Sequence, residues 1–268
     1  MRRLIRAILF VVVVLIVLAI VGVVGVILFA NRAVQTAVET AGTRALNVAV
    51  RVDRTGVSLP AGTVDLYGIT VANPPGYEGP ALLKLQQADL KVNTGSLLSE
   101  QVHIEEMKLD NMQVFIEQKG LQNNLYQVIQ PLREPRRPTG RGLLIDNLEI
   151  RNVTVHAAMT TIPGQTPGVD LKIASIRMTD LGRHEKVDVA VLISKIVLAV
   201  AEGIAQEGGG ILPKEALGDL GSILDQAIDI GKIILTPGGQ TPDGQQKDSL
   251  GKTVTDGIKD LFGGKKKQ

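Results

Sequence analysis

The chain has 268 residues, a formal net charge of +2 and no cysteine, which excludes disulfides, thiol chemistry and thiolate metal sites. Six of its 29 basic residues lie at the two ends, and the remainder balances 23 basic against 27 acidic residues, so no nucleic-acid footprint is present. Aromatic residues make up 3% of the chain and tryptophan is absent, which argues against base-stacking or carbohydrate-binding platforms.

An apolar run from Ala7 to Ala30 has no charge, no proline and no polar side chain. At ~1.5 Å per residue it is about 36 Å long, enough to cross a hydrocarbon core of ~30 Å. A cleaved signal peptide has a core of only about 7 to 15 residues, so we expect a permanent transmembrane helix. Three arginines precede the run, whereas only Arg32 and Arg44 follow closely, and the positive-inside rule therefore places the N-terminus in the cytoplasm.

The next residues change from a helical to a strand-like period. Small apolar residues at helical spacing predict a short helix from Asn31 to Leu46. From Val48 to Met178, apolar and polar residues mostly alternate between breaks at Gly, Asn and Pro, which predicts an antiparallel meander of about nine strands. Asn123 to Ile129 interrupts this pattern with one or two predicted helical turns, followed by a proline- and arginine-rich loop.

A six-residue pattern recurs three times in the meander: apolar, any, Gly or Asn, apolar, any, Val. The copies are Leu66 to Val71, Leu109 to Val114 and Ile150 to Val155, at spacings of 43 and 41 residues. In each copy the apolar alternation slips by one at Gly68, Asn111 or Asn152. These residues tolerate φ > 0, so the slip fits either one extra residue in a strand or a tight turn between two short strands.

Helical periodicity returns after Lys186. Lys186 to Glu207 is apolar on most sides, and its charges at Asp188, Lys195 and Glu202 are seven residues apart, which predicts a helix buried except for one narrow polar stripe. A second membrane span is the rival interpretation. Pro213 to Gly231 and Asp248 to Phe262 are predicted as further helices, and the last is amphipathic and followed by Lys265 to Lys267. This last segment is either a peripheral element that contacts an anionic bilayer surface or a partner, or simply a frayed terminal helix.

The sequence offers no arrangement that points to catalysis. His103, His156 and His184 have no further ligand residue at metal-binding spacing. Nucleophile-elbow, Walker and dinucleotide motifs are also missing. We therefore expect neither an enzyme nor a cofactor.

Several segments resemble the N-terminal region of AsmA-like bacterial envelope proteins, over about Met1 to Gly182. They are Val57 to Leu59, Leu66 to Tyr77 with its Asn-Pro-x-Gly-aromatic turn, Ser96 to Leu98, Ile104 to Asp110, and Asn124-Leu125. The resemblance implies a periplasmic, taco-shaped β-groove of the lipid-transfer type, anchored in the inner membrane. The chain departs from the larger members by stopping after few repeats and adding helices. Nine strands at ~4.8 Å would give a groove about 45 Å long, too short for an envelope-wide bridge.

The predicted fold class is α+β: a transmembrane helix, then a curved antiparallel sheet with C-terminal helices packed on it. The predicted units are a cytoplasmic tip and anchor at 1–30, a β-groove domain at 31–182, a helical cap at 183–247, and an amphipathic helix with a basic tail at 248–268. The predicted groove-lining residues are Leu66, Ile69, Val71, Leu109, Val114, Ile116, Ile150 and Val155.

The functional expectation is a non-catalytic, single-pass inner-membrane protein that assists envelope biogenesis or lipid handling. Its expected partners are the phospholipid bilayer and acyl chains in the groove, and no nucleic acid. The alternative is a membrane-anchored adaptor built on a sealed sandwich that resembles water-stress and LEA-type domains. A groove only partly covered by Lys186 to Glu207 favours the first function, and a sealed core favours the second.

Overall fold

The computed structural model describes residue 25 and residues 29–119, 122–133, 137–159, 168–208 and 233–237. The predicted transmembrane helix Ala7 to Ala30 lies outside the described residues apart from positions 25, 29 and 30, and the predicted helices Pro213 to Gly231 and Asp248 to Phe262 lie wholly outside them. A helix over residues 29–46, here the N-terminal helix, leads into the sheet. The later elements are β1 (Val50–Ser58), β2 (Thr63–Val71), β3 (Leu83–Val92), η1 (Thr94–Leu98), β4 (Gln101–Lys119), β5 (Gln122–Asn123), α2 (Asn124–Ile129), η2 (Gln130–Arg133), β6 (Gly142–Met159), β7 (Gly168–Leu181), α3 (Val189–Gly208) and β8 (Ile233–Pro237).

The strands form one eight-stranded sheet in the order β1-β2-β3-β4-β6-β7-β8, with the short β5 paired to β4. All neighbours are antiparallel except β4 and β6, which are parallel. The predicted simple meander is therefore wrong at this point. After β4, the chain passes through β5, α2 and η2 and returns to the end of the sheet where β4 began, so β6 must run in the same direction as β4.

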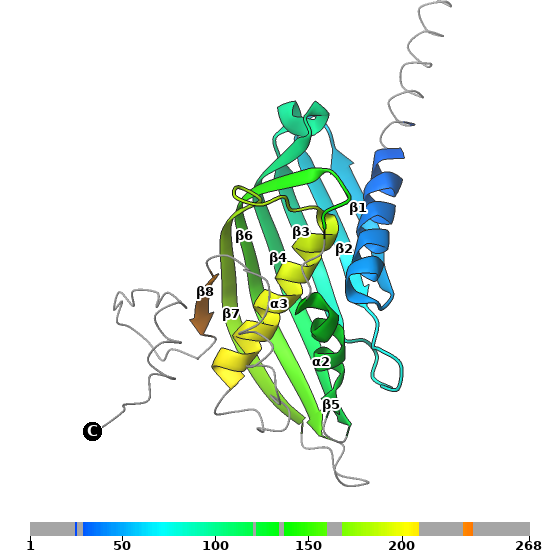
Figure 1. Ribbon diagram of the computed structural model, residues 1–268, viewed down its shortest axis with the longest axis vertical. Helices are drawn as coiled ribbons and strands as arrows, with labels where there is room; N and C mark the ends of the chain where they lie inside the picture. Colours follow the sequence, from blue (N-terminus) through cyan, green and yellow to red (C-terminus); the bar gives the residue numbers. More distant parts are fainter. Residues whose placement is uncertain are drawn as a thin grey trace, which may run out of the picture.

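The helices lie on one face of the curved, open sheet, which we call the inner face (Figure 1). Helix α3 crosses this face diagonally, α2 lies beside it, and the N-terminal helix follows the β1 edge. The fold is therefore α+β, with an antiparallel-rich sheet and a helix packed on it after the last long strand, as predicted. Strand β8 was not predicted, because its apolar residues are too few to show a period.

Gly68, Asn111 and Asn152 all have positive φ, at 65°, 56° and 54°. The strands run straight through these positions, so the interpretation as tight turns between strands is wrong. A lone extra residue is also wrong, because the register between β2 and β3, and between β4 and β6, is the same on both sides of the slip. The alternation of inward and outward side chains shifts by one residue at the same level in neighbouring strands. Mostly apolar side chains therefore face inward on both sides of the shift.

The spacing of 41 residues in the repeat equals the register offset of the parallel strands β4 and β6. Asn111 and Asn152 consequently lie side by side in one row across the sheet, and Asn111 Nδ2 donates to Gln86 Oε1 of β3 at 3.0 Å. In the same row, Gly68 faces Asp53 of β1, whose carboxylate occupies the space that a Cβ at Gly68 would need. The repeat therefore marks one transverse line of the sheet.

The N-terminal helix protects the free edge of β1 with polar side chains at every fourth residue. Asn31 accepts from the Val57 N–H at 2.8 Å, and Thr43 accepts from the Val50 N–H at 3.0 Å. Between them, Gln35 donates to the Val52 carbonyl at 2.6 Å and Glu39 accepts from the Val52 N–H at 2.9 Å. An uncovered edge strand invites pairing with other chains, and these bonds occupy its backbone groups instead. They also fix the direction in which the helix leaves the sheet.

Candidate functional site

The candidate site is the inner face of the sheet together with the helices that cover it. All eight residues predicted to line a groove belong to one continuous hydrophobic cluster, in which Ile69 is partly buried and the other seven are buried. They come from β2, β4 and β6. The sequence pattern therefore located one apolar surface, which the structure covers with helices.

Helix α3 packs most closely against β7. A Cβ built at Gly203 would lie 3.1 Å from Ile176 Cδ1 and 3.3 Å from Ile173 Cδ1, so only glycine permits this approach without a shift. Among the described residues, α3 is the one helix long and apolar enough to cross a membrane. It lies on the sheet, however, and 67% of its most apolar stretch is buried inside the protein. The structure therefore favours its interpretation as a cover over the second-span interpretation.

A small apolar void remains where the N-terminal helix, α2 and α3 meet over the sheet. Its volume is about 10 Å³, and it is lined by Leu46, Val71, Leu82, Leu83, Val114, Leu125, Val197 and Val200. A space of this size holds one water at most. An acyl chain can reach these residues only if a helix moves.

The three charged residues of the predicted polar stripe, which lie in α3 and at the residue before it, are buried, and this reverses the prediction of a solvated stripe. Asp188, Lys195 and Glu202 are all at most 9% exposed. Lys195 Nζ pairs with Glu185 Oε1 at 2.6 Å, and Glu202 Oε1 accepts from Gln206 Nε2 at 3.0 Å. The heptad spacing placed the charges on one face correctly, but the pairing partners let that face be buried. Burial of charge offsets part of the apolar stabilisation, so α3 is a weaker cover than an all-apolar helix would be.

Asp188 begins α3 and ties it to the loop before β6. Its carboxylate accepts backbone N–H groups of Val191 at 3.0 Å, Thr139 at 2.8 Å and Gly140 at 3.0 Å. Burial of this carboxyl group raises its pKa, but these donors, with the N–H of Ala190, favour the ionised form and lower the pKa below its ordinary value. Asp188 therefore stabilises the start of the cover as a carboxylate.

At the opposite end of the sheet, the buried residue Asn124 joins α2 to β4 and to the loop after β2 by hydrogen bonds. Asn124 Nδ2 donates to Asn73 Oδ1 at 2.8 Å and to the Phe115 carbonyl at 2.7 Å, while Asn124 Oδ1 accepts from the Glu117 N–H at 2.9 Å. The Glu117 carboxylate accepts from Asn73 Nδ2 at 2.9 Å and from the Gly79 N–H at 2.7 Å. Two segments that carry the family resemblance, the Asn-Pro turn and Asn124-Leu125, thus meet directly.

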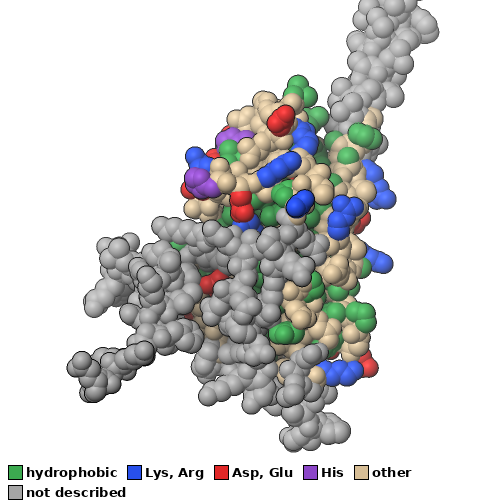
Figure 2. All heavy atoms as spheres, viewed as in Figure 1, with side chains coloured by type: hydrophobic (Ala, Val, Ile, Leu, Met, Phe, Trp, Pro, Cys, Tyr) green, Lys and Arg blue, Asp and Glu red, His purple; other side chains and the backbone are tan. Residues whose placement is uncertain are grey.

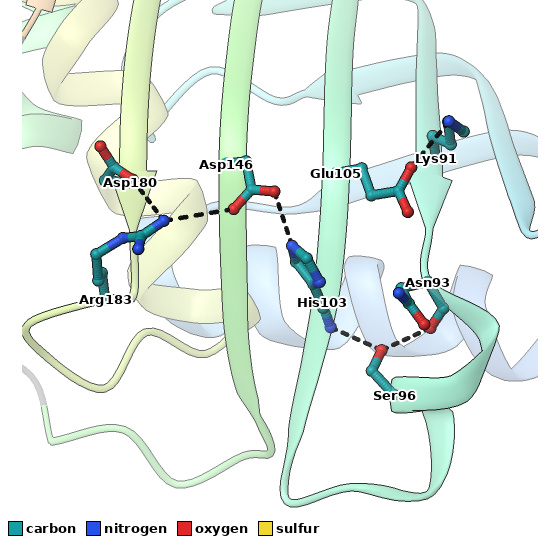
Figure 3. Close-up of polar contacts among 8 residues, drawn as sticks. All are labelled: Lys91, Asn93, Ser96, His103, Glu105, Asp146, Asp180 and Arg183. Carbon is teal, nitrogen blue, oxygen red and sulfur yellow. Dashed lines mark hydrogen bonds and ion pairs between the residues drawn. The ribbon is translucent and has the colours of Figure 1, made fainter.

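The end of the sheet near η1 carries a connected row of polar contacts from His103 through Asp146 and Arg183 to Asp180 (Figure 3). His103 Nε2 lies 2.8 Å from Asp146 Oδ2, and Arg183 Nη2 lies 2.8 Å from Asp180 Oδ1 and 3.8 Å from Asp146 Oδ1. Within the described part of the chain, no three His, Asp or Glu side chains gather as metal ligands. The contacts tie neighbouring strands together on the surface.

An open polar cleft of about 370 Å³ lies at this same end. It is lined by Glu100, Gln101, Gly142, Gly182, Arg183, His184, Glu185 and Lys186. The side-chain amide of Gln101 donates to the carbonyls of Leu143 and Gly182 at 3.2 and 3.0 Å, so it is committed to the backbone. The sequence did not predict this cleft, because its residues come from the starts of two strands and a loop.

A family model described as the AsmA family matches residues 1–190 of the chain. The matched range contains the N-terminal helix and every strand from β1 to β7. A search of curated proteins gives no significant match.

Proposed function

Because this chain belongs to the AsmA family, we propose that it is a non-catalytic envelope protein that shields lipid acyl chains against the inner face of its sheet. In this proposal Ala7 to Ala30 anchors the chain once in the inner membrane, with the N-terminus in the cytoplasm and the sheet in the periplasm. The observation that carries the proposal is the continuous apolar surface of the inner face, which joins residues from the N-terminal helix to α3.

The proposal requires α3 to act as a displaceable cover. The void of about 10 Å³ beneath the helices is too small for an acyl chain. An acyl chain entering the inner face would replace the apolar contacts of α3, while Lys195 and Glu202 would regain solvent. Helix α3 and an acyl chain would therefore compete for the same apolar surface of the sheet.

Gly203 provides the test, because it sets how closely α3 approaches β7. The change Gly203→Leu leaves no room beside Ile173 and Ile176 and pushes the helix outward. The full-length protein is purified in a mild detergent, and phospholipid per protein is measured by mass spectrometry. We expect more bound lipid in Gly203→Leu than in the wild type, and no increase in Ala205→Leu, a matched change at a half-buried position of the same helix. Lipid around the anchor is common to all three proteins and cancels.

The second candidate is a sealed adaptor module, and the closeness of the cover favours it. If α3 never leaves the sheet, the inner face is simply a hydrophobic core and function lies on the outer surface. Gly203→Leu would then lower stability without any gain in bound lipid. That result would replace lipid shielding with the adaptor function.

A further inference from the structure

Three large hydrophobic side chains are exposed in the described part of the chain: Phe29 at 76%, Leu59 at 40% and Leu98 at 99%. All three lie at one end of the molecule. Leu59 is in the turn between β1 and β2, which contacts the end of β3 just before η1, since the Val92 N–H donates to the Gly62 carbonyl at 2.7 Å. In Figure 1, η1 and the free end of the N-terminal helix project from this same end. We call this end, with Leu59 and Leu98 at its tip, the apolar rim.

Leu98 is held rigidly rather than left on a loose loop. Ser96 Oγ donates to the Asn93 carbonyl at 2.6 Å and accepts from the His103 N–H at 2.9 Å, as Figure 3 shows. From the other side, Arg141 donates to the carbonyl of the residue before Leu98 at 2.9 Å. A fully exposed leucine on a bonded 3₁₀ turn is an apolar contact already in place for a partner.

The rim reaches as far toward the predicted membrane span as the N-terminal helix does. Asn31 Oδ1 accepts from the Val57 N–H at 2.8 Å, so these two residues are level. From there Phe29 is two helical residues further on, ~3 Å, whereas Leu59, the first residue of the turn after β1, is two residues beyond Val57, at most ~7 Å. Beyond Phe29, the helical residue Gly25 is exposed, with no neighbouring atom within 4 Å of where its Cβ would be. The helix has therefore left the domain at the level where Leu59 ends.

The charge around the rim fits an anionic lipid surface. Among the described residues at this end, Arg32 on the N-terminal helix, Arg137 and Arg141 before β6, and Arg183 and Lys186 after β7 are exposed. The exposed acidic residues near them are Glu100, Asp180 and Glu185, so basic side chains are in excess. Figure 2 shows hydrophobic side chains at the upper tip of the coloured part of the molecule, with both acidic side chains and Lys and Arg side chains below them. Apolar tips flanked by cations are the arrangement of interfacial membrane contacts.

We propose that the apolar rim docks into the headgroup region of the bilayer beside the anchor, with Leu59 and Leu98 inserted. This inference rests on the proposed function, because it requires Ala7 to Ala30 to span that bilayer. The N-terminal helix is bonded along β1 from Asn31 to Thr43, and in this proposal that attachment sets the depth of the rim. The end of the inner face nearest the membrane then meets lipid directly, without a gap of water.

The chain has no cysteine, so single cysteines can be placed without other changes. Leu59→Cys and Leu98→Cys test the rim, Leu15→Cys tests the anchor, and Glu78→Cys is the control on an exposed loop at the opposite end of the sheet. Each full-length variant is labelled with the fluorophore NBD and reconstituted into vesicles of phosphatidylethanolamine and phosphatidylglycerol. Quenching is measured with nitroxide-labelled lipids.

We expect nitroxide lipids to quench the probes at positions 15, 59 and 98 and to leave the probe at 78 unchanged. Quenching at 15 with positions 59 and 98 behaving like 78 would overturn rim docking, leave the anchor intact, and make the two leucines contacts for a protein. No quenching at 15 would overturn the anchoring itself, and rim docking with it. The two failures are therefore distinguishable.

Discussion

The substitution Asn124→Ala should be among the most destabilising single changes in the sheet domain. Asn124 is fully buried and makes four hydrogen bonds, the fourth being its Oδ1 accepting from the Leu125 N–H at 2.9 Å. With alanine at this position, the Phe115 carbonyl and the Glu117 N–H each lose the hydrogen bond that Asn124 makes to them. At ~1–3 kcal/mol for each buried unsatisfied group, and allowing for non-additivity, we expect a loss of about 3–5 kcal/mol.

The matched control is the neighbouring Asn123→Ala. Asn123 caps α2 by accepting from the Tyr126 N–H at 2.7 Å, and loss of such a cap costs ~1–2 kcal/mol. For a domain of this size, ~1 kcal/mol corresponds to roughly 2–4 °C in Tm, so Asn124→Ala should lower Tm by roughly 6–20 °C and Asn123→Ala by no more than ~8 °C.

Thermal unfolding of the full-length protein in detergent, followed by circular dichroism, gives the two Tm values. Hydrogen–deuterium exchange should show faster exchange in residues 72–82 for Asn124→Ala alone, because Asn124 joins that segment to α2 through Asn73. Equal Tm shifts for the two variants, or unchanged exchange in residues 72–82, would refute the assignment of Asn124 as the link.

Three further predictions test the row, the helix cap and the outer surface. Gly68→Val should cost ~1–2 kcal/mol or more, from the left-handed backbone and the missing space for a Cβ, whereas Thr70→Val should change stability little; equal Tm values would remove the backbone explanation. Folding lowers the pKa of Asp188, so its contribution to the free energy of unfolding is present above the ordinary value of 3.8 and is lost as pH falls below it. Asp188→Asn should therefore reduce the pH dependence of the free energy of unfolding, measured with urea between pH 5 and pH 2, and an unchanged pH dependence would contradict this. Burial and the neighbouring Asp89 raise the pKa of Asp65, so Asp65→Asn should stabilise the protein at pH 7 by a few tenths of a kcal/mol; a lower urea midpoint would count against this repulsion.

The sequence predicted the apolar inner surface well, because strand periodicity depends only on local alternation. Its slips at Gly68, Asn111 and Asn152 were read correctly as positions that need positive φ. Alternation carries no information about which strand pairs with which, and the parallel pairing of β4 and β6 was missed for that reason. The 41-residue repeat contained the signal, since it equals the register offset of those strands.

Charged and polar residues were the harder part of the prediction. The stripe of Asp188, Lys195 and Glu202 was expected in solvent, because a single sequence does not show that Glu185 would pair with the lysine. On the N-terminal helix, the apolar residues were noted, but the polar positions that bond to β1 were not. Their four-residue interval, from Asn31 to Thr43, was a visible signal for a helix that covers a strand edge.

The predicted units at 1–30, 31–182, 183–247 and 248–268 stay predictions, as do the topology with the N-terminus inside and the peripheral role of Asp248 to Gln268. A reporter fused after Gln268 should be active only outside the cytoplasm, and activity only in the cytoplasm would contradict the topology. Liposome co-sedimentation of the Asp248 to Gln268 peptide should be salt-sensitive, and binding indifferent to salt and lipid charge would count against an electrostatic contact.

The central claim is that acyl chains reach the inner face, and photo-crosslinking in cells tests it most directly. A diazirine analogue of leucine at position 83 replaces a buried residue that lines the void, with little change in shape. The same analogue at Lys84, the next residue along β3, lies on the exposed outer face. The account predicts phospholipid adducts at position 83 and none at position 84. Adducts at neither position, or equally at both, would contradict it.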